Sequence, residues 1–522
     1  MTQTTATDTP AAAAPPSKPP PYGRRRVIGL FAGIGLLLLF LLTGPPADMS
    51  VAAWHTAGVV ALMGAWWVTE ATHITVTGLV PLVLFPLLDI LSAHEVSTAY
   101  ADHIVFLFFG AFFLAIAMEK WQLHRRVALL ILSGIGRSPQ LLILGFLSTT
   151  ALLSMWVSNT ASTIIMLPIA LAVLHHAASQ GYDTTQGFGI ALMLGLAYSA
   201  SIGGVSTPVG TPPNVVFMGA FTRLFPDAPD IGFFQWMLFG VPTAAFMVGS
   251  VWFYLVYIYF RVPSAGWQDN QAFLAQQLKD LGPIYGGERR VLLLSLTTAL
   301  LWIFRKDIDF GSLSLPGWAS LFPHPHHIQD STVAILAAIL LFLVPSGQKK
   351  GEFLLTWDDT AKIPWGILVL LGGSLALAEG VGHSGLANWA GSQLSFLRDV
   401  SPLVAIFSVC ALMVWLTEFT SNTATTTLVM PVLAATATGL EVDPLLLMIP
   451  ATFAASFAFM LPTATAPNAI IFASGHVTLP QMFGAGFGLN ILSILILTGL
   501  LYVIGVPAFG IGLDSLPDWV PR

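Results

Sequence analysis

Charged residues are scarce in this sequence, and their scarcity excludes most classes of water-soluble protein. Only 9% of the 522 residues are charged, whereas 55% are hydrophobic, and the mean hydropathy is +0.78. A water-soluble domain carries about 25% charged residues. Most of this chain is therefore expected to lie in lipid. The net charge of −6 comes without a stripe of Lys and Arg, which excludes nucleic acid as a partner.

Cysteine and catalytic motifs are also missing. Cys410 is the only cysteine, which excludes an intramolecular disulfide and most cysteine-based metal sites. No apolar segment carries a His-Asp-Ser set or an HExxH pattern, so we do not expect an enzyme. Lys/Glu relays are almost absent from the apolar segments, which disfavours a channel or an energy-converting membrane subunit.

The N-terminal region divides into a tail and a first membrane helix. Residues 1–23 are rich in Ala, Pro and Thr without apolar periodicity, which predicts a disordered cytoplasmic tail. Residues 24–50 begin with three arginines and continue into the apolar run 27–43. This run is long enough to span a membrane and no small-residue cleavage pattern follows it. We therefore interpret it as a retained first transmembrane helix and not as a secretory signal.

Apolar windows of spanning length follow along the chain, separated by polar residues, Gly or Pro. They fall near 27–44, 52–69, 74–92, 103–119, 188–222, 233–260, 288–304, 330–345, 365–381, 443–474 and 484–506. Two further apolar stretches, 139–176 and 401–439, each contain a central Ser-Asn-Thr. Each is too long for one span, and its two arms are short for two spans. This length predicts a re-entrant helical hairpin whose tip lines a cavity.

The distribution of basic residues favours this topology. With a cytoplasmic N-terminus and hairpins that do not cross, 15 of the 20 Lys and Arg residues lie on the cytoplasmic side. Full crossing by one hairpin would move the basic clusters at 289–290 and 349–350 outside. The sequence therefore predicts an all-α polytopic protein of the cell inner membrane with 11 transmembrane helices, two re-entrant hairpins and an extracytoplasmic C-terminus at 511–522.

Two short motifs occur twice in the same order, which indicates an internal repeat. Ser158-Asn159-Thr160 and Ser421-Asn422-Thr423 begin two eleven-residue segments that are identical at six positions, at an offset of 263 residues. Pro-rich runs follow them at 207–214 and 461–468, at an offset of 254. Two motif pairs in one order are difficult to obtain by chance.

The predicted topology makes the two repeats inverted, because one hairpin enters from the cytoplasm and the other from outside. Inverted repeats with broken helices are typical of secondary transporters that bind substrate near the membrane midplane. Within the repeats we expect broken helices at 188–222 and 443–474. Between the repeats, in the linker, we expect an amphipathic surface helix over 269–281. The predicted divisions are repeat 1 at 51–261, a cytoplasmic linker at 262–287 and repeat 2 at 288–510.

The residue types at the breaks suit an alkali cation. Ser and Thr hydroxyls, Asn amide oxygens and carbonyls freed by proline are neutral oxygen ligands of the kind that hard cations prefer. Ser154 and Thr417 lie one helical turn before the tips and add hydroxyls from the same face. Gly210 and Ala464 allow a facing carbonyl to approach closely. We therefore expect two similar Na⁺ sites, one in each half.

The two tips also suit an anion. The half-helices after Asn159 and Asn422 direct positive dipole ends toward the centre, and the hydroxyls of Thr160 and Thr423 can donate there. No Lys or Arg lies within either tip or either Pro-rich run. The charge of a bound dianion would therefore be balanced by co-bound cations and helix dipoles. The sequence predicts cation-coupled transport of a small dianion.

Alternatives stay open for several neighbouring residues. We interpret Ser162, Thr163, Thr425 and Thr426 either as helix caps or as ligands. Glu418 beside the second tip and Glu379 at a span end are either proton- or cation-binding groups or solvated carboxylates that face loops. Residues of these types also serve helix packing and kinking in membranes. The repetition of both motif pairs favours a binding site over that structural role.

At these motifs the sequence resembles the divalent anion:sodium symporter family, whose members include the INDY-type dicarboxylate transporters. The resemblance covers about 27–506 and rests on the paired Ser-Asn-Thr motifs and Pro-Asn runs. It implies a homodimer in which a transport domain moves against a scaffold domain by an elevator-type alternating-access mechanism. The sequence departs at Thr465-Ala466-Pro467, where the family often has Thr-Pro-Pro.

The resemblance also implies the roles of particular residues. One sodium site would use Ser154, Ser158, Asn159 and Gly210, and the other would use Thr417, Thr420, Ser421, Asn422 and Ala464. The substrate carboxylates would meet Ser158, Asn159, Thr160, Thr211, Pro212, Ser421, Asn422, Thr423, Thr465 and Ala466. Intact Ser-Asn-Thr motifs resemble sodium-coupled members and favour C4-dicarboxylates such as succinate, malate and fumarate over citrate. The alternative is a sodium-independent exchanger of dicarboxylates or of another divalent anion, such as citrate or sulfate.

Overall fold

The computed structural model describes residues 23–135, 138–185, 187–267, 270–309, 314–393, 400–513 and 515–520. The predicted tail at 1–23 lies outside these residues except for Gly23, and part of the predicted C-terminal segment at 511–522 does so too. Among the described residues nearly all regular structure is helical. One two-stranded antiparallel sheet pairs β1 (Ile308–Asp309) with β2 (Ser314–Leu315), with Ile308 opposite Leu315.

The helices follow one another with short connections. The first half contains α1 (Arg24–Leu42), α2 (Val51–Thr69), α3 (Ile74–Thr77), α4 (Val80–Leu87), α5 (Ala93–Tyr100), α6 (His103–Lys120), α7 (Leu123–Ile135), α8 (Pro139–Ser154), α9 (Asn159–Ser179), α10 (Phe188–Gly204), α11 (Pro212–Leu224), α12 (Phe233–Phe253) with η1 (Tyr254–Tyr259), and α13 (Gln271–Asp280). The second half contains α14 (Gly286–Ile303), η2 (Trp318–Leu321), η3 (Pro325–His327), α15 (Asp330–Leu343), η4 (Trp357–Lys362), α16 (Trp365–His383), α17 (Leu386–Gln393), α18 (Pro402–Thr417), α19 (Asn422–Leu440), α20 (Leu445–Ala454), α21 (Ala466–Ala473), α22 (Leu479–Leu500) with η6 (Leu501–Gly505), and α23 (Val506–Phe509).

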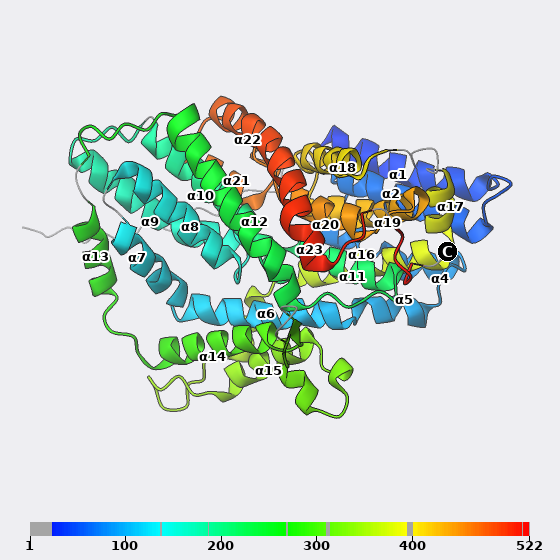
Figure 1. The fold of residues 1–522 in the computed structure, drawn as a ribbon, viewed down its shortest axis with the longest axis horizontal. Coiled ribbons are helices and arrows are strands. Elements are labelled where there is room, and N and C mark those ends of the chain that lie inside the picture. The colour runs from blue at the N-terminus through cyan, green and yellow to red at the C-terminus, as the bar shows by residue number, and fades with distance from the viewer. Residues whose placement is uncertain are drawn as a thin grey trace, which may run out of the picture.

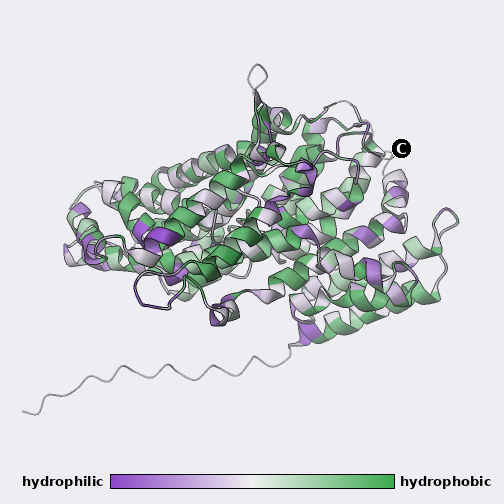
Figure 2. Ribbon diagram, turned by 90° about the horizontal axis from the view of Figure 1, so that it is seen from below, coloured by the Kyte–Doolittle hydropathy of each residue, from purple (hydrophilic) through white to green (hydrophobic). Residues whose placement is uncertain are grey.

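The length and composition of these helices are those of a multi-pass membrane protein. Among the described residues, eight helices are long and apolar enough to cross a membrane. Figure 2 shows hydrophobic residues along most of the helices, with hydrophilic residues concentrated at their ends and in connections. The fold class is therefore confirmed as a mostly helical polytopic membrane protein. The division into 11 spans and two re-entrant hairpins stays a prediction.

One predicted span is not a single helix. The apolar window at 74–92 forms the short helices α3 and α4, which separate at Gly78. Gly78 lies against a second glycine, because a Cβ added to Gly373 would lie 2.2 Å from the Gly78 carbonyl oxygen. Pro81 and Pro86 follow within α4, and proline removes donors from the helix ladder. The close backbone approach and the prolines together explain the break.

Both predicted hairpins consist of two helices that separate at the Ser-Asn-Thr motif. The chain leaves α8 after Ser154 and enters α9 at Asn159, and it leaves α18 after Thr417 and enters α19 at Asn422. The first helix of each hairpin, α8 or α18, also begins in the same way. A Ser-Pro pair starts it, and the serine accepts a hydrogen bond from a backbone N–H in the first turn. Serine caps followed by proline are typical helix starts.

Both predicted broken helices are interrupted in their Pro-rich runs. The chain unwinds between α10 and α11 in the first half and between α20 and α21 in the second. Each following helix begins at the residue after a threonine, with proline in its first turn. Proline is tolerated there because the first N–H groups of a helix have no partner within the helix. The non-helical segment is longer in the second half, since α20 ends at Ala454.

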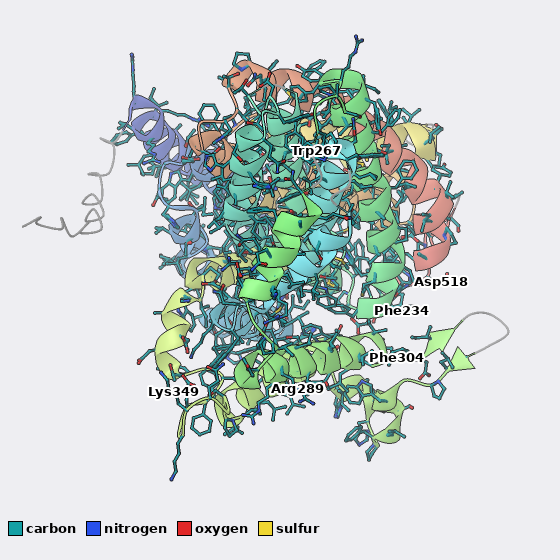
Figure 3. All side chains as sticks on the ribbon, turned by 90° about the vertical axis from the view of Figure 1, so that its left-hand side faces the viewer. Phe234, Trp267, Arg289, Phe304, Lys349 and Asp518 are labelled. Carbon is teal, nitrogen blue, oxygen red and sulfur yellow. The ribbon has the colours of Figure 1, made fainter. Side chains whose placement is uncertain are left out.

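The helices pack into two hydrophobic cores. The larger core is built mainly from α8 to α10, α12 and α18 to α22, and the smaller core mainly from α2, α4 to α6 and α14 to α16. In Figure 1 the long α6 runs between the helices α8, α10 and α12 on one side and α14 and α15 on the other. Figure 3 shows α14 from Arg289 at one end to Phe304 at the other, with Lys349 near the Arg289 end.

The predicted amphipathic helix of the linker is present as α13, which packs against α7. Its described residues start at Gln271, and residue 269 lies outside the described part of the chain. Leu274 is fully buried in the larger core. The helix ends before Gly282, whose φ of +71° is typical of a glycine stop.

Candidate functional site

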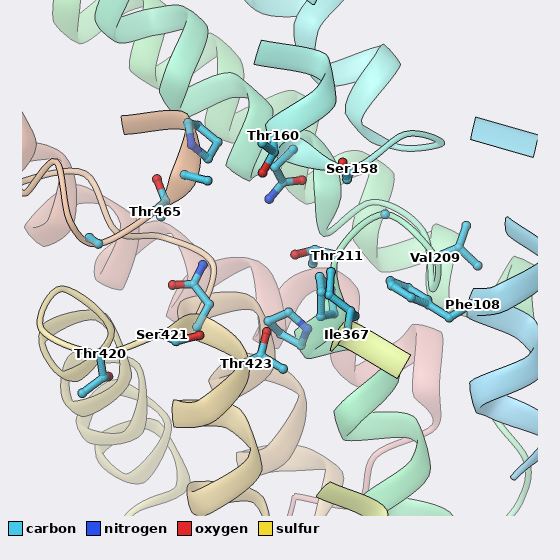
Figure 4. A pocket seen from close by; sticks show the side chains of 18 of the residues that line it. Phe108, Ser158, Thr160, Val209, Thr211, Ile367, Thr420, Ser421, Thr423 and Thr465 are labelled. Atoms are coloured by element: carbon cyan, nitrogen blue, oxygen red, sulfur yellow. The ribbon is translucent and has the colours of Figure 1, made fainter. Parts of the chain in front are cut away.

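A cavity of about 460 Å³ lies where the two hairpin tips and the two unwound segments meet. Figure 4 shows Ser158 and Thr160 on one side of it, Ser421 and Thr423 on another, and Thr211 and Thr465 from the broken helices. All ten residues that the sequence analysis gives to the substrate line this one cavity: Ser158, Asn159, Thr160, Thr211, Pro212, Ser421, Asn422, Thr423, Thr465 and Ala466. Residues about 260 positions apart in sequence are thus brought together.

Behind the first tip, three oxygen atoms gather around one hydroxyl proton. Ser154 Oγ lies 2.8 Å from Asn159 Oδ1 and 2.6 Å from the carbonyl oxygen of Ala200. Ser154 is fully buried. A hydroxyl has one hydrogen to donate, so one of the two acceptor oxygens is left without it. An oxygen cluster that is short of protons is favourable for a cation.

The second half repeats this cluster. Thr417 Oγ1 lies 2.7 Å from Asn422 Oδ1 and 2.8 Å from the carbonyl oxygen of Ala455. Thr417 is also fully buried. The hydroxyl comes again from the last residue of the first hairpin helix, and the amide comes from the first residue of the second. We refer to the two sets as the first and second oxygen clusters.

Each unwound segment is held by an asparagine whose role the sequence analysis did not assign. Asn214 Nδ2 donates to the carbonyl oxygens of Gly204 and Thr207, at 3.1 and 2.7 Å. Asn468 Nδ2 donates to those of Ala458 and Leu461, at 3.0 and 3.1 Å. Both side chains are fully buried. Their conservation between the two Pro-rich runs was the signal, because an amide can bridge two carbonyls that have left a helix ladder.

Gly210 occupies a position where a side chain does not fit. A Cβ added there would lie 2.3 Å from the carbonyl oxygen of Gly204. A Cβ added to Gly204 would in turn lie 2.4 Å from Asn159 Oδ1. The first unwound segment therefore depends on glycine for a close approach of backbone to backbone. Ala464 takes the place of Gly210 in the second half and lines the same cavity.

Four helices begin at the cavity. Their first residues are Asn159, Pro212, Asn422 and Ala466, and all four residues line it. The N-terminus of a helix carries about half a positive charge and usually unpaired N–H groups, although the first two residues of α11 are prolines without an N–H. Ser158 Oγ satisfies one such group by accepting from the N–H of Ala161 at 3.3 Å. The arrangement attracts an anion without a basic side chain from the tips or the Pro-rich runs.

The hydroxyls next to the tips act neither as helix caps nor as cavity ligands in this structure. Thr163 and Thr426 donate back to the carbonyl oxygens of Asn159 and Asn422, at 2.9 and 2.8 Å. Thr425 shares a hydrogen bond with the hydroxyl of Thr420. The hydroxyls of Thr163, Thr425 and Thr426 do not cap α9 or α19, and neither does the buried hydroxyl of Ser162. The helix-cap interpretation of these residues is therefore wrong.

Thr420 lines the cavity, but its hydroxyl points back to the last turn of α18, which ends at Thr417. Thr420 Oγ1 donates to the carbonyl oxygen of Leu416 at 2.8 Å, besides its contact with Thr425. It does not join Thr417 and Asn422 in the second oxygen cluster. The assignment of Thr420 as a sodium ligand stays a prediction that would require its side chain to turn.

The two carboxylates that the sequence left open are both paired with donors. Glu418 is fully buried and accepts hydrogen bonds from the backbone of the second unwound segment. Its interpretation as a solvated loop residue is wrong, because the unwound segment folds over it. Glu379 is part-buried and accepts a hydrogen bond of 2.6 Å from Arg223, which also binds Asp102 at 2.7 Å.

The cavity has further walls that the sequence analysis missed. Helix α6 contributes an apolar wall that includes Phe108 and Phe112, and α16 contributes Ile367. Arg25 and Glu70, from the start of α1 and the end of α2, line its rim. The three arginines at the start of α1 indicate only topology in the sequence, since nothing there relates them to motifs more than 130 residues away.

Comparison with known proteins agrees with this architecture. Residues 24–508 match the family described as the sodium:sulfate symporter transmembrane region. The chain is 39% identical to the sodium-dependent dicarboxylate transporter SdcS of Staphylococcus saprophyticus over 496 residues, which cover 94% of this chain and 93% of the relative. It is 40% identical to SdcS of Staphylococcus aureus strain MRSA252 over 501 residues, 95% of this chain and 94% of the relative.

Two solved structures share the fold at low sequence identity. The YdaH transporter of Alcanivorax borkumensis superposes with a TM-score of 0.56 at 14% identity, covering 94% of this chain and 99% of that chain. MtrF of Neisseria gonorrhoeae, from a class of antimetabolite efflux pumps, gives a TM-score of 0.59 at 11% identity, with 94% and 97% coverage. The match over almost the whole chain and the 39% identity to curated transporters confirm the resemblance read from the repeated motifs. The chain belongs to the divalent anion:sodium symporter family, whose members are membrane transporters and not enzymes.

Proposed function

We propose that this protein is a sodium-coupled symporter that carries C4-dicarboxylates such as succinate, malate and fumarate into the cell. The relatives SdcS, at 39–40% identity, are named sodium-dependent dicarboxylate transporters. The cavity between the tips is the substrate site in this proposal. Na⁺ is a co-transported substrate and not a resident cofactor.

The pair of oxygen clusters is the observation that carries the proposal. Each cluster places a hydroxyl between an amide oxygen and a carbonyl oxygen, and the distances agree between halves to within about 0.2 Å. Neutral oxygens in this number suit Na⁺, because a small monovalent cation needs several ligands and no strong field. A mere packing role would not require the same proton-deficient arrangement twice.

The opposite side of the tips suits the dianion. Threonine hydroxyls from all four segments, Thr160, Thr211, Thr423 and Thr465, line the cavity together with the four helix N-termini. Hydroxyls and N–H groups can donate to carboxylate oxygens, and the dipole ends favour negative charge. The two Na⁺ ions would balance two negative charges, so the loaded site needs no basic side chain against the substrate.

We further propose an elevator-type motion in a homodimer of the cell inner membrane, with a cytoplasmic N-terminus. The presence of two hydrophobic cores supports a division into a moving and a static domain, because most of the oxygen-cluster helices share the larger core. The rim residues Arg25 and Glu70 belong to the predicted cytoplasmic side. The cavity would then open toward the cytoplasm in this structure. The homodimer rests on the resemblance to the family.

Uptake of labelled succinate into proteoliposomes tests the coupling. We expect uptake that follows an inward Na⁺ gradient and falls to background when K⁺ replaces Na⁺. Uptake that is indifferent to this exchange but requires a dicarboxylate or another divalent anion inside the vesicles would establish the sodium-independent exchanger instead. Competition by unlabelled malate, fumarate, citrate and sulfate then ranks the substrates.

Two substitutions test the placement of the sites. Asn159→Ala and Asn422→Ala remove one amide from each oxygen cluster, and we expect each to abolish Na⁺-driven uptake. Ser250→Ala is a matched control, because its hydroxyl only donates to the carbonyl of Phe246 on an exposed helix face. A monodisperse elution profile shows that each variant is folded. Normal uptake by either asparagine variant would contradict the site assignment.

A further inference from the structure

Glu418 is a carboxylate buried at the second tip, directly after Thr417 of the second oxygen cluster. Its Oε1 accepts hydrogen bonds from the N–H groups of Phe459 at 2.7 Å and Met460 at 2.9 Å, and from Asn490 Nδ2 at 2.7 Å. Its Oε2 accepts from the N–H of Leu461 at 3.1 Å. Four donors around one carboxyl group match the ionised form, which only accepts.

The first half has no such group. Met155 stands where Glu418 stands, at the offset of 263 residues between the hairpins. The corresponding backbone N–H groups of Val205 and Ser206 bond to the carbonyls of Ile202 and Gly203, at 3.4 and 3.1 Å. The end of α10 thus satisfies these two donors itself.

The length of the helices explains this difference. Helix α10 continues to Gly204, whereas α20 ends at Ala454, about one helical turn earlier after alignment of the Pro-rich runs. Phe459, Met460 and Leu461 have therefore left the helix ladder, and buried N–H groups without a partner are costly. The carboxylate of Glu418 takes the place of that missing turn.

The charge of Glu418 is not neutralised by a side chain. In the described part of the chain, the structure shows no Lys, Arg or His paired with it. An unpaired charge inside a membrane is expensive and marks a functional position. The nearest arrangement that favours a cation is the second oxygen cluster, which begins at the preceding residue.

We infer that Glu418 is a positioning residue that makes the second cation site the stronger of the two. Its carboxylate holds the backbone of residues 459–461 in the unwound segment and adds a negative charge beside the second oxygen cluster, whereas the first cluster has neither. The two sites are therefore similar in their direct ligands but different in affinity. This inference rests on the proposed sodium coupling and specifies which site fills first as Na⁺ rises.

Sodium titration of the purified full-length protein without dicarboxylate tests the inference. Trp156 lines the cavity, so Trp fluorescence and the apparent melting temperature both report Na⁺ binding, with K⁺ as the control for ionic strength. We expect Glu418→Gln to raise the Na⁺ concentration for half-saturation at least about tenfold, the effect of removing one nearby opposite charge. Ser154→Ala should weaken the Na⁺ response of Glu418→Gln further, and Thr417→Ala should add little to it.

Three control variants separate charge from packing. Asp443→Asn changes another buried carboxylate, which accepts from the N–H groups of Leu445 and Gly512 away from the cavity, and should leave Na⁺ binding unchanged. Asn490→Ala removes one donor but keeps the charge, and should change the half-saturating Na⁺ concentration less than twofold. Glu418→Asp keeps the charge on a shorter side chain and replaces Glu418→Gln if that variant does not fold. In that case the Glu418→Asp variant should still bind Na⁺, and adding Thr417→Ala to it should abolish this binding.

The outcomes distinguish the inference from the proposed function. A wild-type protein that responds equally to Na⁺ and K⁺ would overturn the sodium coupling itself. A wild-type response to Na⁺ together with an unchanged half-saturating concentration in Glu418→Gln would overturn only the inference. A lowered melting temperature without a change in Na⁺ half-saturation would do the same, because it would show that Glu418 is merely structural.

Discussion

The two halves of the molecule build the same oxygen cluster on different supports. In the first half, glycines at 203, 204 and 210 press backbones together, and a Cβ at Gly203 would lie 2.2 Å from the carbonyl oxygen of Ala151. In the second half, Phe457, Ala458 and Ala464 stand at the corresponding positions. There the helix ends a turn earlier and the buried Glu418 holds the unwound backbone.

This difference shows which features the site requires. The hydroxyl lies at similar distances from the amide and carbonyl oxygens in both halves, although the backbone behind it follows another path. Ligand geometry is therefore the shared requirement, whereas the means of holding it is free to vary. Since the first support consists of glycines and the second includes a buried carboxyl group, the two halves are not expected to respond alike to equivalent substitutions.

Among the changes that compare the two supports, the largest effect is expected from exchanging the small residues of the two unwound segments. Gly210→Ala places a Cβ against the Gly204 carbonyl, and we expect uptake to fall more than about tenfold, because backbone cannot yield as a flexible side chain does. Ala464→Gly introduces no steric clash and removes none, so uptake should stay within about twofold of the wild-type rate. Initial rates of succinate uptake compare both variants. Equal losses would refute the idea that the two supports differ.

A smaller effect is expected from the asparagines that bridge the unwound carbonyls. Asn214→Ala and Asn468→Ala each remove two hydrogen bonds, and the loss of buried partners costs about 1–3 kcal/mol. We expect Asn468→Ala to be the milder change, because Glu418 also holds that segment. Apparent melting temperatures in detergent measure both. The comparison fails if Asn468→Ala is the more destabilising variant.

The smallest expected effect on transport concerns an ion cluster around Arg223, a residue of the first half. Arg223 near the end of α11 binds Asp102 and Glu379, at 2.7 and 2.6 Å, whereas Val477 stands at the corresponding place in the second half. These contacts join α11 to α6 and α16 of the smaller core. An elevator motion of α11 would have to break them, so they stabilise the present conformation.

Arg223→Gln should therefore increase the population of the opposite conformation several-fold while leaving Na⁺ dependence unchanged. The single native cysteine is buried, so Cys410→Ala provides a background for labelling a cysteine introduced at Ile367 in the cavity wall. We expect faster labelling by an impermeant maleimide from the extracellular side. Arg26→Gln, which breaks an exposed ion pair with Glu70, is the control. Identical labelling rates for the two variants would exclude a role for the Arg223 cluster in gating.

Much of the fold and of the candidate site could be predicted, because lipid limits the structures that a chain can adopt. Backbone groups in a membrane must be paired, so long apolar runs form helices. Non-helical polar tips are tolerated only where they line a cavity or are buried in protein. The repeat then related Ser154 to Thr417 and Asn159 to Asn422, and the structure places each pair at equivalent distances. The sequence analysis misses the bridging role of Asn214, because it interprets the Pro-rich run only as a source of oxygen ligands.

Other features depended on contacts between distant segments. Nothing in the sequence places Arg25 at the rim of the cavity or buries Glu418 beneath residues 459–461. For Thr163 and Thr426 the sequence leaves helix cap and ligand open, and the cap alternative is wrong because both hydroxyls bond one turn back along their own helix. The local sequence cannot decide between capping and donation to a carbonyl one turn back, since the threonine hydroxyl can do either.

The sequence by itself determined that this chain is a membrane protein of two related halves and which polar residues stand at their breaks. Hydropathy and repetition carry that information because they are properties of neighbouring residues. Only the tertiary structure decided that the breaks meet in one cavity, that the two halves support them differently, and that one of these supports is a buried carboxyl group. Those features arise where helices pack together, and packing depends on residues that lie far apart in the chain.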